Sequence, residues 1–163
     1  NIYEYNISNS LWRSFHPSLK IPSLSENEFK DSLKLCIEIH EEVLNSNHFN
    51  MGLLVYNGKV CHKVVKSEAN LENDISHVSM ELIKLAADHQ LMLSKRKDTN
   101  IDYLCTGYDI FLYQEPCLLC ASALLHARVS RIFFKAENCL LKKGGVSGDC
   151  QVQFFEGINH RYN

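Results

Sequence analysis

One strand–helix–strand alternation constrains the fold of this chain more than any other feature of its sequence. Residues 103–113 are rich in apolar and aromatic side chains, as in a strand, and Pro116 ends that run. Residues 117–127 indicate a helix, and residues 129–134 form a second apolar run typical of a strand. Strands joined through a helix pair in parallel, and the helix covers one face of their sheet. The pattern therefore predicts an α/β fold.

Helical patterns also occur twice in the first part of the chain. Ser25 and Glu28 have the spacing of a capping box, which predicts a helix that begins there. Apolar residues then recur at helical spacing, at Phe29, Leu33, Ile37, Val43 and Leu44. A second helix is predicted over residues 77–93, with an apolar side formed by Ile83, Ala86, Ala87 and Leu91.

The remaining segments are a hairpin, an arm and a loop. Asn57-Gly58 separates two strand-like runs, residues 51–56 and 60–65, which is a strong signal for a β-hairpin. Residues 1–23 have a mixed composition and are predicted to form an irregular N-terminal arm that packs through its aromatic side chains. Residues 24–163 are predicted to form one domain, within which residues 140–151 are a flexible loop.

Composition narrows the possible environments and partners. The chain has seven cysteines, an odd number, and no signal peptide, which favours a reducing compartment over secretion. No apolar run approaches the length of a membrane span, so no contact with a membrane is expected. A net charge of −2 is not typical of a domain that grips nucleic acid alone. Because the chain starts at Asn1 rather than Met, we expect it to be trimmed at one or both ends.

The sharpest chemical signal is Pro116-Cys117-Leu118-Leu119-Cys120, at the junction between the predicted strand and helix. Two thiolates separated by two residues can bind one tetrahedral zinc ion. A helix N-terminus helps, because its dipole and free N–H groups favour the thiolate over the thiol. The motif alone is also compatible with a redox pair or with two buried cysteines.

His77 supplies the second half of a metal site. It begins the helix predicted over residues 77–93, so its imidazole can meet the two thiolates where two helix N-termini approach one edge of the sheet. One histidine and two cysteines leave a fourth tetrahedral position open, as in a catalytic zinc site. The order of these residues matches the zinc-deaminase signature H-x-E…P-C-x-x-C. The sequence therefore predicts zinc bound by His77, Cys117 and Cys120; the alternative is a helix-start histidine and a buried cysteine pair.

The catalytic acid of that signature is missing. Its glutamate, two residues after the histidine, moves the proton from zinc-bound water to the substrate base, but Ser79 occupies this position here. Serine has no group that titrates near neutral pH, and loss of a positioned acid or base typically removes about 10²–10⁴ in rate. Glu81 lies one helical turn beyond His77, and Glu115 lies beside Pro116. Neither is expected to replace the missing acid.

Two runs in the second half of the chain resemble a known family. Residues 103–112 are Y-L-C-T-G-Y-D-I-F-L, and residues 115–129 are E-P-C-L-L-C-A-S-A-L-L-H-A-R-V. They resemble the Y-L-C-T-G-Y-D-x-Y-L and E-P-C-x-M-C-x-x-A-L-x-H-S-R-I runs of the non-catalytic subunit of the eukaryotic heterodimeric tRNA adenosine deaminase. Residues 11–16, L-W-R-S-F-H, and residues 158–162, I-N-H-R-Y, resemble two further motifs of that family. The family has valine where active deaminases have glutamate, so Ser79 departs from both patterns.

The resemblance implies a cytidine-deaminase-like fold, a three-layer α/β/α sandwich with a mixed central sheet. It also implies a zinc-dependent hydrolase complex that converts the wobble adenosine of tRNA anticodons to inosine. In such a heterodimer a paralogous catalytic subunit supplies the working glutamate. This chain would then be a zinc-binding pseudoenzyme subunit with no catalytic residue, in contact with the catalytic subunit and with tRNA, in the nucleus and the cytoplasm.

Two other functions remain open from the sequence. One is an active stand-alone nucleoside or nucleotide deaminase that uses another acid, and the other is a structural zinc module in an unrelated assembly.

Arg128 and Arg131 fit the family's S-R-I-x-R run and are candidates for subunit or phosphate contacts. Solvated or partner-facing charges have the same pattern.

Overall fold

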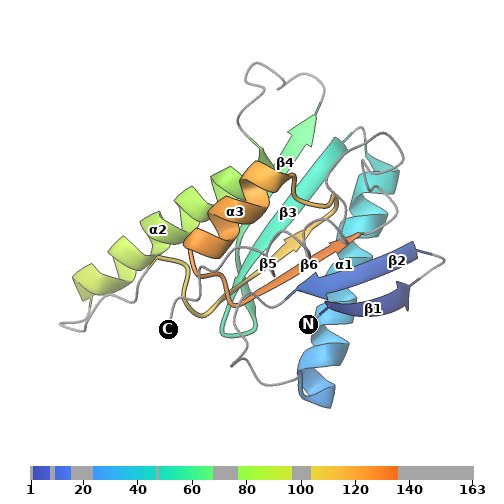
Figure 1. Cartoon of the computed structure of the whole chain (residues 1–163), viewed down its shortest axis with the longest axis horizontal. Coiled ribbons are helices and arrows are strands. Elements are labelled where there is room, and N and C mark those ends of the chain that lie inside the picture. The colour runs from blue at the N-terminus through green and yellow to red at the C-terminus, as the bar shows by residue number, and fades with distance from the viewer. Residues whose placement is uncertain are drawn as a thin grey trace.

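Six strands form one mixed sheet, and three helices cover its two faces (Figure 1). The computed structural model describes residues 2–7, 10–15, 24–46, 48–67, 77–96 and 104–135. The strands are Ile2–Ile7 (β1), Ser10–Phe15 (β2), His48–Tyr56 (β3), Lys59–Ser67 (β4), Tyr108–Leu112 (β5) and Arg131–Lys135 (β6). The helices are Glu26–Asn45 (α1), Val78–Arg96 (α2) and Leu118–His126 (α3). The strand order is β1-β2-β6-β5-β3-β4, with β5 and β6 parallel and the other neighbours antiparallel.

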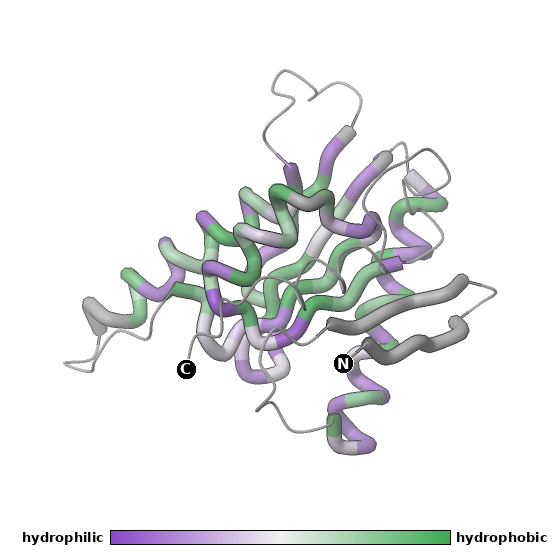
Figure 2. Tube along the Cα trace, viewed as in Figure 1, coloured by the Kyte–Doolittle hydropathy of each residue, from purple (hydrophilic) through white to green (hydrophobic). Residues whose placement is uncertain are grey.

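Side chains of the sheet divide between two hydrophobic cores, one on each face. Ile110 and Leu112 of β5 enter the core beneath α2 and α3, whereas Phe111 enters the core beneath α1. All five residues of β5 are buried, and Figure 2 shows continuous hydrophobic colouring along the central strands. A strand covered on both faces is what a layer of helices on each side requires. The predicted three-layer α/β/α sandwich with a mixed sheet is confirmed.

The strand–helix–strand prediction is confirmed by β5, α3 and β6. Residues of the two strands pair in parallel register, with Phe111 opposite Phe133. Their rings stack with centroids 4.3 Å apart, a contact worth about 0.5–1.5 kcal/mol beyond the area that it buries. The strand begins at Tyr108 rather than near residue 103, because a turn with positive φ at Leu104 (48°) and Gly107 (84°) precedes it. The carboxyl end of β5 leads directly to the start of α3.

Two local sequence signals form the structures that they predict. Ser25 and Glu28 form the capping box of α1, in which the Glu28 N–H donates to the Ser25 hydroxyl at 3.3 Å and the Ser25 N–H donates to the Glu28 carboxylate at 3.0 Å. Asn57 and Gly58 join β3 to β4 with φ values of 50° and 72°. Two successive positive φ values are the requirement of a type I′ hairpin turn, which explains the Asn-Gly pair.

The apolar sides of α1 and α2 differ in part from the predicted ones. The buried residues of α1 are Ser32, Cys36, Ile39 and Val43. Leu44 and Leu91, which the helical patterns included, are 65% and 51% exposed. In α2 the buried stripe instead runs through Val78, Leu82 and Ala86, at intervals of one turn. The side of each helix that faces the sheet is therefore partly different from the side that its apolar residues predicted.

The prediction of an irregular N-terminal arm was wrong for the residues that the structure describes there. β1 pairs with β2, and β2 pairs with β6 from Trp12 opposite Lys135 to Phe15 opposite Ile132. The sequence of β2 has no clean alternation, so its pairing is decided by the open edge of β6, which is distant in the chain. Residues 140–151 and 158–162 lie outside the described ranges, and their predicted features stay predictions. In the described part of the chain, no helix has the length and apolar character needed to cross a bilayer.

Candidate metal centre

The N-termini of α2 and α3 meet at the carboxyl end of β5. His77 lies immediately before α2, and its carbonyl accepts hydrogen bonds from the N–H groups of Met80 and Glu81 at 2.9 and 3.2 Å. Cys117 is the N-cap of α3, and its carbonyl accepts from the N–H of Ala121 at 2.8 Å. Both residues therefore stand at helix starts, where unpaired N–H groups and the helix dipole favour negative charge on a neighbouring sulfur.

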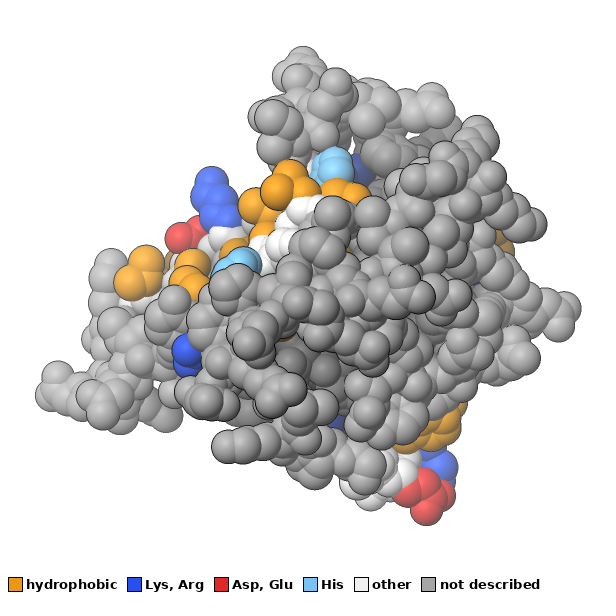
Figure 3. Space-filling view, viewed as in Figure 1, with side chains coloured by type: hydrophobic (Ala, Val, Ile, Leu, Met, Phe, Trp, Pro, Cys, Tyr) orange, Lys and Arg blue, Asp and Glu red, His pale blue; other side chains and the backbone are white. Residues whose placement is uncertain are grey.

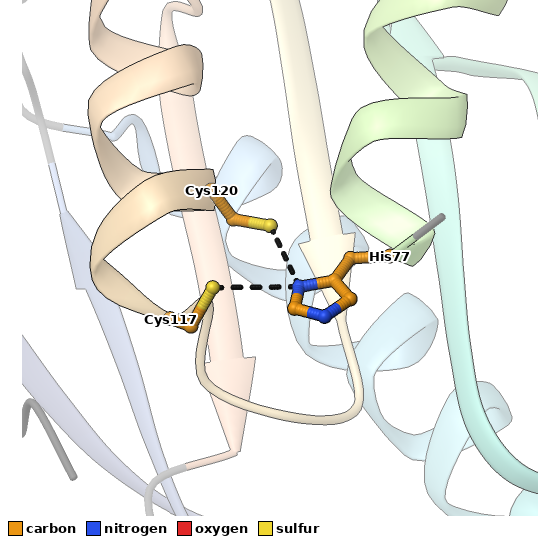
Figure 4. Close-up of side chains that lie close together, drawn as sticks. All are labelled: His77, Cys117 and Cys120. Atoms are coloured by element: carbon orange, nitrogen blue, oxygen red, sulfur yellow. Dashed lines mark hydrogen bonds between the residues drawn. The ribbon is translucent and has the colours of Figure 1, made fainter. Parts of the chain in front are cut away.

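The three residues predicted to bind metal lie together (Figure 4). The Nδ1 atom of His77 lies 3.2 Å from the Sγ of Cys120 and 3.4 Å from the Sγ of Cys117. All three possible ligand atoms lie within 4.8 Å of one another. Figure 4 shows the imidazole entering from the start of α2 with Nδ1 turned toward both sulfurs of α3. Cys117 and Cys120 follow His77 by 40 and 43 positions in the sequence, and the fold brings their side chains next to its imidazole.

These distances fit a zinc ion. Zinc bonds of about 2.0–2.1 Å to nitrogen and about 2.3 Å to sulfur, at tetrahedral angles, place the nitrogen about 3.5 Å from each sulfur. The observed separations of 3.2 and 3.4 Å are close to that value. Both cysteines are free thiols rather than partners in a disulfide. The arrangement is compatible with zinc, while the role of the three residues as ligands remains a prediction.

The cluster is buried on one side and accessible on the other. Cys120 is 1% exposed, whereas Cys117 is half-buried and His77 is exposed. The pKa of the Cys120 thiol is raised to about 12, mainly because burial disfavours the thiolate and also because Cys117 lies beside it. A divalent cation would oppose this effect, since metal binding offsets the thiolate charge and releases the protons.

Ser79 occupies the position of the missing acid, in the first turn of α2. It is 4% exposed. The sequence showed that no carboxylate stands here, and the structure adds that the serine is buried. Its hydroxyl could not shuttle a proton at neutral pH.

The two acids considered as replacements are placed differently from each other. Glu81 is half-buried and forms an ion pair with Lys66 of β4, so its carboxylate is not a freely solvated charge. Glu115 is buried directly before Pro116 and the N-cap residue Cys117 of α3. Among the described histidine, cysteine and acidic residues, the group that could hold a metal contains no carboxylate.

Arg131, a candidate for partner or phosphate contacts, is engaged within the chain. Its Nε and Nη2 atoms donate to the Asp109 carboxylate at 2.8 and 2.5 Å. Its Nη1 atom lies 3.3 Å from a Glu28 oxygen, so the start of α1 is joined to β5 and β6. Burial raises the pKa of Asp109, and the guanidinium opposes that effect. Asp109 was not recognised from the sequence, because its partner lies 22 residues away.

Exposed apolar side chains gather on the face formed by α2 and α3 (Figure 3). Leu91 and Met92 stand at the carboxyl end of α2, and Leu119 stands in the first turn of α3. Leu119 is 57% exposed and lies between the two cysteines in sequence. One exposed apolar side chain, that of Leu119, therefore stands in the same helical turn as the two cysteines.

Comparisons with known proteins point to one group of relatives. No family model matches the chain. It is 38% identical over 66 residues to the zebrafish (Danio rerio) "Probable inactive tRNA-specific adenosine deaminase-like protein 3", covering 40% of this chain and 19% of that protein. It is 48% identical over 60 residues to the Arabidopsis thaliana "tRNA-specific adenosine deaminase TAD3", covering 37% and 14%. It is 32% identical over 100 residues to the Schizosaccharomyces pombe "tRNA-specific adenosine deaminase subunit tad3", covering 60% and 31%.

These matches cover less than a third of the length of each of these three relatives. A solved chain from a study of tRNA:A34 deaminases gives a TM-score of 0.41 at 18% identity, over 63% of this chain and 72% of that one. That similarity is too low to establish a fold. The likeness to the eukaryotic proteins is at the level of sequence, and it recurs in animals, a plant and a yeast. The chain is thus similar to the TAD3 and inactive tRNA-specific adenosine deaminase-like proteins, which confirms the resemblance predicted from its sequence.

Proposed function

We propose that this chain belongs to the non-catalytic, zinc-binding subunit of a heterodimeric tRNA adenosine deaminase, which converts the wobble adenosine of tRNA anticodons to inosine. One observation carries the proposal. A metal-compatible cluster of His77, Cys117 and Cys120 stands beside Ser79, where a deaminase needs glutamate. A chain that has the metal-binding residues but lacks the catalytic glutamate suits a subunit whose partner carries out the deamination. The names of the relatives agree with this assignment.

Zinc is the metal that best fits the ligand set. Two thiol sulfurs and one imidazole nitrogen are preferred ligands of zinc, which readily adopts tetrahedral geometry. When bound, it would supply a Lewis acid and a cross-link between secondary-structure elements. His77 would contribute the start of α2, and Cys117 and Cys120 would contribute the start of α3. The cluster would then hold both helices on the same face of the sheet.

The surroundings of the cluster explain why the subunit would be inactive. Deamination needs a group that takes a proton from water and returns it to the leaving amine. Ser79 offers only a hydroxyl at the position of the acid, and Glu81 is paired with Lys66. Loss of the acid costs about 10²–10⁴ in rate. A partner with an intact glutamate would carry out the reaction.

The surface fits a subunit that binds a partner rather than one that grips RNA alone. Exposed Leu91, Met92 and Leu119 are the kind of side chains that a subunit contact buries. The net charge of −2 provides little overall attraction for a polyanion. Most of the positive surface for tRNA would therefore lie on other segments of the complex. The complex would act in the nucleus and the cytoplasm.

The test is inosine formation at the wobble position of a full-length tRNA. Three samples are compared: this chain alone, a catalytic TAD-type partner alone, and the two co-expressed. The proposal expects inosine only, or far faster, in the co-expressed sample. Activity of this chain alone would instead indicate a stand-alone deaminase, and no gain on mixing would indicate a zinc module of another assembly.

A further inference from the structure

The two cysteines of the cluster differ in their access to solvent. Cys117 is half-buried at the N-cap of α3, where its backbone is still extended, with φ of −65° and ψ of 168°. Cys120 lies three residues further on, within the first turn, and is 1% exposed. Both are free thiols, and their sulfurs lie within 4.8 Å of each other (Figure 4). A dissolved reagent can therefore reach the sulfur of Cys117, and the sulfur of Cys120 lies close behind it.

We propose that this pair is also a thiol–disulfide exchange site, which reacts with a small disulfide of the glutathione class when no metal is bound. The inference rests on the proposed metal cluster and adds a second reaction of the same two sulfurs. Two cysteines separated by two residues at the start of a helix are the arrangement of redox-active dithiols. Here the fold adds what the motif alone does not give, namely one accessible sulfur and one buried sulfur within reach of it.

The reaction consists of two successive exchanges. The thiolate sulfur of Cys117 attacks one sulfur of the small disulfide, whose S–S bond breaks and releases one glutathione, which takes up a proton. The sulfur of Cys120 gives its proton to solvent, attacks the Cys117 sulfur of the mixed disulfide and releases the second glutathione. Two protein thiols are thereby oxidised to one disulfide, and one glutathione disulfide is reduced to two thiols.

The start of α3 can accommodate this disulfide. Side chains three residues apart on a helix have Cβ atoms about 5–6 Å apart, whereas a disulfide needs about 3.5–4.5 Å. Cys117 precedes the first helical residue, Leu118. Adjustments of its backbone and side chain can therefore narrow the gap without unwinding the helix.

Zinc and the disulfide would compete for the same sulfurs. Zinc binds thiolates and not a disulfide, so bound metal favours the reduced pair. At free zinc 1,000-fold above its Kd, the equilibrium constant for oxidation falls about 1,000-fold. For this two-electron couple, that factor lowers the reduction potential by about 90 mV. Oxidation would in turn expel the metal and release the start of α3 from His77.

The experiment follows the thiol state of the full chain, co-expressed with its partner where solubility requires it. The protein is equilibrated with glutathione buffers of increasing disulfide content, either with a zinc chelator or with excess zinc. Acid quenching and alkylation preserve the thiol state, and fragment ions in peptide mass spectrometry locate each disulfide. The variants Cys120→Ser and Cys117→Ser separate the two roles. Cys61→Ser is the matched control, because it removes a half-buried free thiol from β4.

Without zinc we expect a disulfide between Cys117 and Cys120 in the wild type and in Cys61→Ser. With free zinc 1,000-fold above its Kd, its formation should require a glutathione redox ratio about 1,000-fold more oxidising. Cys120→Ser should accumulate a mixed disulfide with glutathione at Cys117, whereas Cys117→Ser should leave the buried Cys120 unmodified.

Three other results would contradict parts of the proposal. No disulfide between Cys117 and Cys120 in the zinc-free chain would overturn the exchange site, and so would equal modification of the two cysteines in the single variants. Zinc binding by that same chain would then leave the metal cluster standing. A disulfide that forms equally with and without zinc would support the exchange site and overturn the metal cluster. The inosine assay tests the proposed subunit role separately.

Discussion

Replacing Gly52 with alanine should destabilise the chain and loosen the candidate metal site together. The added Cβ atom would lie 2.7 Å from Val78 Cγ1, 2.9 Å from Leu82 Cδ1 and 3.0 Å from Leu112 Cδ2. All three neighbours are buried, and Val78 is β-branched, so its side chain cannot easily rotate away. Overpacking of a filled core costs about 1–3 kcal/mol, and these contacts place Gly52→Ala in the upper half of that range.

The response should be a small movement of α2 away from β3. His77 and Ser79 stand at the start of this helix, so the shift would also displace one proposed zinc ligand and its neighbour. Urea denaturation of the zinc-loaded chain measures the free energy of unfolding, and chelator competition measures zinc affinity. We expect a loss of about 2–3 kcal/mol and weaker zinc binding.

Gly58→Ala is the matched control for this prediction. Gly58 has a φ of 72°, and no atom lies within 4 Å of the added Cβ. Alanine there introduces only backbone strain of about 1–2 kcal/mol, in a hairpin turn outside the cluster. Its zinc affinity should equal that of the wild type. A Gly52→Ala chain with wild-type stability and wild-type zinc affinity would refute the close packing of α2 on β3 as the support of the site.

Three further predictions concern the metal, a buried ion pair and pH. Cys117→Ala should remove the bound zinc; at free zinc 1,000-fold above its Kd this removes about 4 kcal/mol, and a calorimetric Tm about 8–16 °C lower would show it. Arg131→Met should lower the free energy of unfolding by about 3–5 kcal/mol in urea denaturation, because Asp109 stays buried without its partner; a loss below 1 kcal/mol would contradict this. The pKa of His89 is lowered by burial and by His62, so the folded state binds fewer protons than the unfolded state. The stability that the neutral form of His89 contributes to the folded state is present above the unfolded pKa of about 6.5. It is lost as the pH falls toward the folded pKa. The drop in Tm between pH 7.5 and 5.5 should thus be smaller in His89→Asn, and an equal drop would oppose the argument.

Local patterns predicted those parts of the fold that are decided by neighbouring residues. The Ser25–Glu28 capping box and the Asn57-Gly58 turn are each fixed within four residues, and both form as expected. The parallel pairing of β5 and β6 followed from the helix between them. The strand β2 was missed because its place depends on the free edge of β6, more than 100 residues away, and not on its own composition.

The candidate site was predicted in its members but not in its surroundings. His77, Cys117 and Cys120 carry a recognisable spacing, and the fold places their ligand atoms within 4.8 Å of one another. The pairing of Arg131 with Asp109 and the pairing of Glu81 with Lys66 have no such spacing. Contacts of this kind depend on how two elements pack, and a single sequence does not reveal which polar side chains then meet.

The most direct test of the central claim isolates this chain's site within the heterodimer. The catalytic glutamate of the partner is replaced by glutamine, so that the site around His77 and Ser79 is the only one left unaltered. Inosine formation at the tRNA wobble position is then compared with that of the wild-type heterodimer. The account predicts a rate lower by about 10²–10⁴-fold or more. A rate close to that of the wild type would contradict it, since this chain would then be carrying out the deamination.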